Sequence, residues 1–437
     1  MGTQRVVVSP ITYDRIRHSM RDSPILPGLK AIYIPNNSSI DFFPIMLLTV
    51  GASLEVVELN DTAISDRNFF IPFMTSLASN SSHLRQLAIR GPGNISLEPV
   101  YRLTSLQRLE IKLPGTYLYP QTVQKLGNLV NLLELIIDVG AEAPVSAIMV
   151  DTRLPKKNKP ISSSSSSGSD RHPASLRRLR IIGMSSSITR VMDDLNLTSL
   201  TELVIDEMPS NSRDDTQVFW RRCFDQISVC HVIEHIEINQ LQQGWGHDHH
   251  PLSTSWFFSL SSLKAIKSLV INGCALSGSD EDFRLLAGMF PKLAKFVVPG
   301  SPGYQSQGGT LACLFYFAQE CPDLREINIC FAFDIHKNLD AVRGLPRTTS
   351  IRHCHPLEKL SIDSQFGQIQ PPHMIEVAEF LDRSFPNLAI LETHGSNSTE
   401  TTNWTGIQQF RVSLQTTRIN AFNRGRSEME MESNDRS

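Results

Sequence analysis

"LREINI", residues Leu324–Ile329, is the stretch that decides the fold. Its apolar residues Leu324, Ile327 and Ile329 stand at offsets 0, +3 and +5 from the first residue, and the polar Asn328 separates the last two. Successive side chains of a strand point to opposite faces of a sheet, so this alternation is typical of a short strand with one buried face. Whether it is a single strand or one unit of an array depends on how often the spacing recurs.

Thirteen stretches of the chain share this spacing. Their first residues are Leu29, Leu54, Leu84, Leu106, Leu132, Leu176, Leu200, Ile233, Ile266, Leu293, Leu324, Leu357 and Leu388. Apart from one step of 44 residues, successive copies lie about 29 residues apart, which is a leucine-rich-repeat period. Each unit has room for a helix after its strand, and no unit can bury its leucines alone. We therefore predict an α/β leucine-rich-repeat solenoid of about 13 irregular repeats, curved, with a parallel inner sheet and outer helices.

The composition between the repeats divides the chain further. The 44-residue step holds a segment with almost no apolar residues and a six-serine run, which is typical of a disordered, solvated insertion. Near the C-terminus, Trp404 to Phe422 should form a capping helix, and the rest of the tail should be disordered. The predicted order is an N-terminal cap or truncated linker at 1–28, repeats at 29–150, the insertion at 151–175, repeats at 176–395, and the cap helix with its tail at 396–437.

Charge and hydropathy limit the partners and the location. The 437 residues include 41 Lys and Arg and 44 Asp and Glu, a formal net charge of −3, which argues against nucleic acid or an anionic membrane as the partner. The most apolar windows are far shorter than the roughly 20 residues that span a bilayer, and the start of the chain does not resemble an export signal. We therefore predict a cytoplasmic and/or nuclear protein.

The cysteines support the same location. There are seven, an odd number, all between Cys223 and Cys354, which favours free thiols in a reducing compartment. Eight Asn-x-Ser/Thr sequons leave a secreted, glycosylated recognition protein open as an alternative.

Two histidine-rich stretches are the strongest candidates for a metal site. "GWGHDHH" contains His247, Asp248, His249 and His250, and "HCH" spans His353 to His355. A structural zinc site needs four ligands at defined spacings, and neither stretch has a partner pair nearby, so polar turns are the simpler interpretation. Phosphate-binding glycine loops and the G-x-S-x-G elbow of hydrolases are also missing from the sequence. We predict no enzyme activity, no cofactor and no metal.

Partner binding remains, and the strands indicate where. Side chains at +2, +4 and +6 should point to the concave side of the solenoid, where such proteins usually bind. Each of these residues could also be part of an ordinary solvated strand face. Basic residues are common in the first half of the set, which favours a protein ligand with an acidic or phosphorylated patch. The candidates are Arg90, Arg108, Glu110, Lys112, Asp138, Arg178, Arg180, Asp206, Glu237, Asn239, Asn272, Lys295, Asn328, Cys330 and Asp363.

The two cysteines that flank the opening stretch should face opposite sides. Cys321 stands three residues before Leu324, and Cys330 stands at +6 on the binding side. The two thiols should therefore be neither a disulfide nor a redox pair. The position of Cys321, three residues before the first leucine of a repeat, is predicted to be a core position. Elsewhere it holds Leu26, Leu103, Leu129, Leu197, Cys230, Leu263, Phe290, Cys354 and Phe385.

Several repeats begin with "CPDL", "FPKL", "FPNL" or "CHPL", and "FFIPFMTSLASNSSHLRQLAI" from Phe69 has the order helix, turn, strand. Over roughly residues 25–395 this combination resembles the F-box/leucine-rich-repeat proteins of basidiomycete fungi. The resemblance implies that the repeats hold a protein destined for ubiquitination, while an F-box docks on the Skp-type adaptor of a cullin ubiquitin ligase. Met1 to Pro27 lacks the F-box pattern, so the adaptor is expected as a partner only if an F-box lies upstream. The alternative is a repeat-only scaffold or regulatory protein unconnected with ubiquitin.

Overall fold

The computed structural model describes most of the repeat region and the C-terminal helix. Its residues group into two compact units, Met1–Val232 and Ile233–Ser437. The predicted insertion at 151–175 lies outside the described residues except for Ser175. The described ranges are 24–36, 46–92, 95–114, 118–139, 175–208, 213–240, 252–274, 276–299, 308–331, 334–346, 355–362, 369–393 and 398–434.

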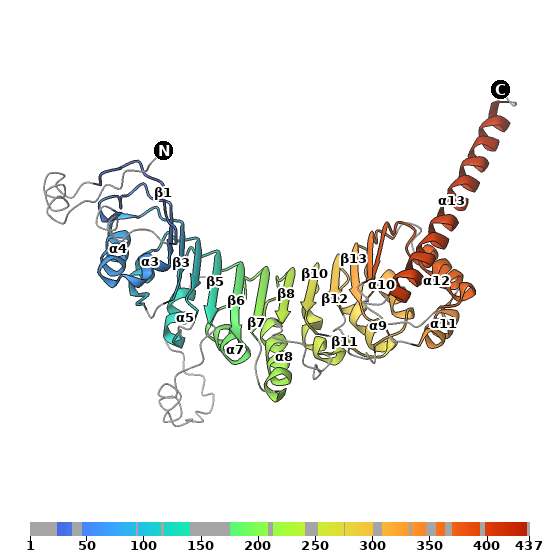
Figure 1. Ribbon diagram of the computed structural model, residues 1–437, viewed down its shortest axis with the longest axis horizontal. Helices are drawn as coiled ribbons and strands as arrows, with labels where there is room; N and C mark the ends of the chain where they lie inside the picture. The colour runs from blue at the N-terminus through green and yellow to red at the C-terminus, as the bar shows by residue number, and fades with distance from the viewer. Residues whose placement is uncertain are drawn as a thin grey trace, which may run out of the picture. The chain divides into compact units, whose positions relative to one another are not determined.

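The first unit is a parallel sheet with helices on one side (Figure 1). Its strands pair in chain order, β1 with β2 and so on to β7. They are β1 (Ala31–Ile34), β2 (Val56–Asn60), β3 (Gln86–Arg90), β4 (Arg108–Lys112), β5 (Glu134–Val139), β6 (Arg178–Met184) and β7 (Glu202–Met208). The helical elements are α3 (Asp61–Ser65), α4 (Arg67–Asn80), the 3-10 helix η2 (Glu98–Arg102), α5 (Pro120–Gly127), α7 (Ser185–Asp194) and α8 (Arg213–Ile227).

The second unit repeats this architecture. Its main strands are parallel and ordered β8 (His235–Gln240), β10 (Ser268–Asn272), β12 (Lys295–Val298), β13 (Glu326–Ile329), β14 (Lys359–Ile362) and β15 (Ile390–Thr393). A separate two-stranded sheet joins β9 (Leu252–Ser253) and β11 (Leu276–Ser277). The helical elements are η3 (Thr254–Ser262), α9 (Asp280–Met289), α10 (Ala312–Glu320), α11 (Ile335–Arg343), α12 (Pro371–Ser384) and α13 (Ser398–Asn434).

All thirteen predicted strands are present, and each begins two residues after the first residue of its repeat. The residues at 0, +3 and +5 form the core between sheet and helices, as Leu324, Ile327 and Ile329 illustrate with 0% exposure. The leucines are buried because each strand stacks on its neighbours in register, which no single repeat could achieve. The predicted α/β leucine-rich-repeat solenoid is therefore confirmed.

Among the described residues, the slot three residues before each repeat is also buried, with one exception; Cys354, predicted for the same slot, lies outside them. Cys321 and Phe290 are fully buried there, but Leu26 is 50% exposed, so the core prediction is wrong at the first repeat. Leu26 belongs to the repeat of β1, which pairs with β2 alone in the described part of the chain. An end repeat receives packing from one neighbour only, and its outermost side chains are covered less.

The C-terminal helix begins where a cap was expected but continues further. α13 packs on β15 and α12, with Trp404 and Ile407 buried, and Figure 1 shows it leaving that contact as one continuous rod. The predicted disordered tail is helical to Asn434, so that prediction is wrong for residues 423–434. Arg, Glu and Met dominate this segment and favour helix, and no proline interrupts it. Among the described residues, no helix is both long and apolar enough to cross a bilayer.

Candidate partner-binding face

The sheet of each unit has one face without helices, which we call the strand face. It is formed by the side chains at +2, +4 and +6 of the strands, and the parallel register lines these up in rows across neighbouring strands. In the first unit, for example, the +2 row runs Arg108, Glu134, Arg178, Glu202 from β4 to β7. Residues that are distant in sequence thereby become immediate neighbours, as the repeat pattern predicts.

This +2 row is an alternating ladder of charges. Arg108 Nη1 lies 3.5 Å from Glu134 Oε2, and Arg178 Nη1 lies 3.9 Å from the same oxygen. Arg178 Nε in turn lies 3.9 Å from Glu202 Oε2. Opposite charges on directly adjacent strand positions attract, and each exposed pair contributes roughly 0.2–1 kcal/mol. The four side chains therefore attract one another weakly on an exposed surface.

A tighter cluster surrounds Glu110 on β4. Arg90 donates two hydrogen bonds to its carboxylate, Nε to Oε1 at 2.7 Å and Nη2 to Oε2 at 2.8 Å, and Lys112 Nζ lies 2.9 Å from Oε1. Arg90 also donates to Glu58 Oε2 at 3.0 Å. The hydrogen bond from Arg90, with that from Lys112, lowers the pKa of the Glu110 carboxyl to about 2 against the opposing effect of burial. The same contacts raise the pKa of Arg90.

These pairs change the expected charge of the face. Arg180 Nε donates to Asp206 Oδ2 at 2.7 Å, so Arg180 is paired as well. The five basic residues named from the sequence are set among six carboxylates in the same rows, which partly offsets the predicted basic character. The preference for an acidic or phosphorylated ligand stays a prediction. The carboxylates are Glu58, Glu110, Glu134, Asp138, Glu202 and Asp206.

Several predicted contact residues lie on the face but are covered. Glu110, Asp138 and Asp206 are only 4%, 7% and 5% exposed, because longer neighbouring side chains close over these shorter ones. A partner would meet the arginines and lysines above them. The carboxylates position those cations and are not themselves open to contact.

The second unit has an amide network in place of the arginines. Asn272 Nδ2 donates to Asn239 Oδ1 at 2.7 Å, and Asn239 Nδ2 donates to Glu237 Oε1 at 2.9 Å. Further along the sheet, Lys295 Nζ lies 2.8 Å from Glu326 Oε2, and both side chains are partly exposed. The predicted residues of this unit are thus also organised by contacts between neighbouring strands.

Three further residues were predicted on the strand face of the second unit. Asn328 is on the face but 9% exposed, and Asp363 lies outside the described residues. Cys330 was expected to be open to a partner, yet it is 5% exposed and its Sγ donates to the carbonyl oxygen of Phe331 at 3.8 Å. That prediction is wrong. Cys330 follows the last residue of β13, and its side chain is short enough to be covered by neighbouring residues.

The thiols provide a direct test of these burials. Six cysteines in the described residues are free and buried, and burial raises the pKa of Cys321 to about 12. We expect neither Cys321 nor Cys330 to react with a thiol reagent in the native protein, because reaction needs an accessible thiolate. Peptide mapping by mass spectrometry after brief labelling checks this in a Cys354→Ser background. Labelling of Cys330 at the rate seen in urea would contradict its burial.

The structure offers no support for a metal site in the residues it describes. No three His, Cys, Asp or Glu side chains come together in those ranges. His247, Asp248, His249, His250, His353 and Cys354 lie outside them. His355 is buried, with Nε2 3.1 Å from the carbonyl oxygen of Cys321 and Nδ1 accepting from Leu357 N–H at 3.2 Å. Burial lowers its pKa, so a neutral ring that joins two repeats is the role its contacts support.

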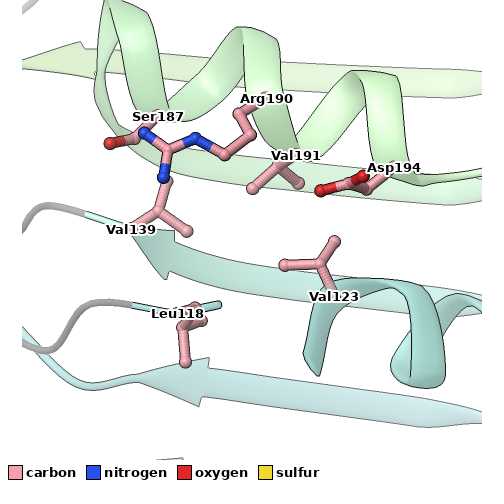
Figure 2. A pocket seen from close by; sticks show the side chains of 7 residues that line it. All are labelled: Leu118, Val123, Val139, Ser187, Arg190, Val191 and Asp194. Atoms are coloured by element: carbon pink, nitrogen blue, oxygen red, sulfur yellow. The ribbon is translucent and has the colours of Figure 1, made fainter. Parts of the chain in front are cut away.

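The described part of the chain has cavities at two helix contacts. One of about 10 Å³ sits between α5 and α7, and Figure 2 shows Val123 and Val191 on opposite sides of it, with Arg190 and Asp194 at its margin. It can hold at most one water molecule. The other, about 520 Å³, lies between β15 and α13, beside Leu391 and Trp404. Sequence periodicity indicated neither, since both depend on how a helix meets its neighbour.

Sequence reasoning also missed a buried carboxyl group in the first unit. Glu207 of β7 is 1% exposed, its Oε1 accepts a hydrogen bond from Ser185 Oγ, and its Oε2 has no hydrogen-bond partner. Burial raises the pKa of Glu207 to about 7, although the bond from Ser185 opposes the shift. A signal was available in the sequence, because Glu207 continues the alternation of the inward-facing Leu203 and Ile205.

Comparison with known proteins adds little to this geometry. No protein-family model matches the sequence, and the search of curated proteins found no match. Among solved structures, a leucine-rich-repeat protein of Leptospira interrogans matches with a TM-score of 0.34 and 12% sequence identity, covering 90% of this chain and 88% of that one. So low a TM-score bears on neither family nor function. The leucine-rich-repeat fold rests on the strands, their register and their buried positions.

Proposed function

We propose that this chain is a non-catalytic protein-binding repeat protein that recognises its partner through the strand face. The observation that carries the proposal is the set of ion pairs that fixes Arg90, Arg108, Arg178 and Arg180 across neighbouring strands. Long side chains normally lose rotamer freedom when they are bound, and side chains that are already held lose less. A pre-arranged pattern of alternating charge suits recognition of a protein surface with the complementary alternation.

A charge-removal experiment tests this proposal. Arg108→Gln with Arg178→Gln neutralises the two arginines of the +2 ladder, and Arg102→Gln with Arg221→Gln makes the same change at exposed positions in η2 and α8. We expect the wild type and the control to recover a common set of proteins by affinity purification and mass spectrometry, and the ladder variant to lose part of that set by at least tenfold. Thermal melts confirm that both variants are folded. Equal recovery by the ladder variant would contradict recognition through this face.

We further propose that the bound protein is a substrate of an F-box-type ubiquitin ligase, in the cytoplasm and/or nucleus. Support comes from the sequence resemblance to F-box/leucine-rich-repeat proteins and from the free, buried thiols, which suit a reducing compartment. A chain extended to any in-frame F-box upstream should co-purify with a Skp-type adaptor and a cullin. If the extended chain recovers neither, the repeat-only scaffold is the better interpretation.

A further inference from the structure

The sheet of the second unit ends at β15, whose outer edge is open. In the described part of the chain, β15 pairs with β14 on one side and with no strand on the other. An edge strand presents backbone N–H and C=O groups with which another extended chain can pair. What this edge can bind follows from how the strands before it bond to one another.

One backbone contact recurs between successive repeats. The carbonyl oxygen at +1 accepts from the N–H groups at +1 and +2 of the next repeat, as Glu358 does from Ala389 and Ile390, both at 2.9 Å. The acceptors of this kind in the second unit are Glu234, Lys267, Ala294, Arg325 and Glu358. In the last repeat the same carbonyl belongs to Ala389, which is exposed and accepts no hydrogen bond from the described residues. The open edge is therefore prepared for two consecutive peptide N–H groups.

A cavity lies beside the same edge. Its volume is about 520 Å³, which is within the range of binding pockets, and Leu391 of β15 and Trp404 of α13 are among the residues that line it. Leu391 occupies the +3 position and is only partly buried, whereas Ile327 and Leu360 at the same position of β13 and β14 are 0% exposed. The cavity is therefore suited to the core-facing side chain of a further strand.

The strand-face side of this edge is apolar. Its +2 position is Ile390, which is 46% exposed. The three preceding strands carry charged residues in that row, namely Lys295, Glu326 and Lys359. Charged side chains on an edge strand discourage pairing with another chain, and β15 lacks that protection at Ile390. A strand added here would cover Ile390 and remove apolar surface from water.

We propose that β15 binds an extended segment of a partner protein, which joins the sheet as one further parallel strand. Its backbone N–H groups bond to the carbonyl of Ala389, one apolar side chain enters the cavity beside Leu391, and a neighbouring side chain on the opposite face covers Ile390. The occupant is a polypeptide because the open groups are main-chain groups with the spacing of the sheet itself. In this mode of recognition the backbone supplies affinity and the pocket supplies specificity. The site is separate from the charge ladder of the first unit.

A displayed library of random linear peptides, selected on the immobilised full chain, serves as the probe. Ile390→Lys gives the edge the charge of the preceding strands. Ile375→Lys is the matched control, since Ile375 is a 38% exposed isoleucine on α12. Both positions are exposed, so neither change should alter the melting temperature. By fluorescence anisotropy, the best peptide should bind Ile390→Lys at least tenfold more weakly than the wild type and Ile375→Lys equally well. Equal affinity for Ile390→Lys, or no enrichment over resin without protein, would overturn the proposal.

N-methylation of that peptide, one residue at a time, tests the backbone pairing. Only alternate residues of a strand direct their N–H groups to a given neighbour, so affinity should fall at every second position. Losses at every third or fourth position would indicate a bound helix and exclude strand addition. A wild-type dimer in light scattering that Ile390→Lys dissociates would make a second copy the occupant and exclude a partner segment. The experiment on Arg108 and Arg178 leaves β15 unchanged, so failure of the proposed function can be recognised separately.

Discussion

Glu207→Gln should raise the free energy of unfolding by about 2 kcal/mol at pH 8 and lower it by up to about 1 kcal/mol at pH 4.5. Burial holds the pKa of Glu207 at about 7, compared with 4.5 for an exposed glutamate. A shift of that size corresponds to about 3 kcal/mol of penalty once the group is ionised in the folded state. Glutamine cannot ionise, so the variant avoids this penalty. Its amide nitrogen takes the place of the unpaired oxygen, however, and the buried donor without a partner costs about 1 kcal/mol, which reduces the net stabilisation at pH 8.

The pH dependence has a definite sign. Between pH 4.5 and 7 the folded protein keeps the proton of Glu207 and the unfolded chain has lost it, so stability falls as the pH rises through this window. Above pH 7 both states are ionised and the penalty is constant. Urea denaturation across the window checks the prediction, with Glu202→Gln on the opposite face of the same strand as control. A variant that is less stable than the wild type at pH 8 would show that the ionised carboxylate is satisfied where it lies.

Glu110→Gln should have the opposite effect and lower the free energy of unfolding by about 2 kcal/mol at pH 7. The substitution removes the charge that accepts from Arg90 twice and lies beside Lys112, and it leaves two cations next to each other. The lowered pKa of about 2 alone corresponds to roughly 3 kcal/mol, and solvent screening of the two partly exposed cations reduces that value.

The contribution of Glu110 also depends on pH. Because its folded pKa is depressed, its stabilisation is complete above pH 4.5 and is lost as the pH falls towards 2. Glu58→Gln is the control, since Glu58 accepts only one bond from Arg90 and should cost less than 1 kcal/mol. Both free energies of unfolding are measured by urea denaturation. If Glu58→Gln and Glu110→Gln lower it equally, the additional contacts of Glu110 do not stabilise the protein further. The combined contribution of Glu110 and Glu207 to stability is therefore greatest near pH 4.5.

The strands could be predicted from sequence because their signal is local and repeated. Leu324, Ile327 and Ile329 indicate a buried face within six residues, and twelve further copies confirm the register. The predicted residues that the structure describes also lie on the strand face. Their environment was not, because it depends on residues one repeat away: Arg90 is neutralised by Glu110 from the next strand.

Single positions were hardest to predict where neighbours decide burial. Cys330 and Asn328 alternate correctly with the core residues of β13, yet both are covered. Glu207 shows the reverse difficulty, because it is a charged residue at an inward position for which the repeat pattern gave no prediction. In each case the missing information was the size of side chains on adjacent strands, which one repeat does not contain.

The charge ladder of the first unit also limits how this array can change in length. Arg108, Glu134, Arg178 and Glu202 alternate on consecutive strands, so deleting the repeat of Glu134 would bring two arginines together, and duplicating it would pair two glutamates. Like charges on directly opposed positions are destabilising. Removing or adding two neighbouring repeats at once keeps the alternation intact. Across these four strands the charge alternation is therefore compatible with an even change in repeat number, whereas an odd change places like charges on adjacent strands.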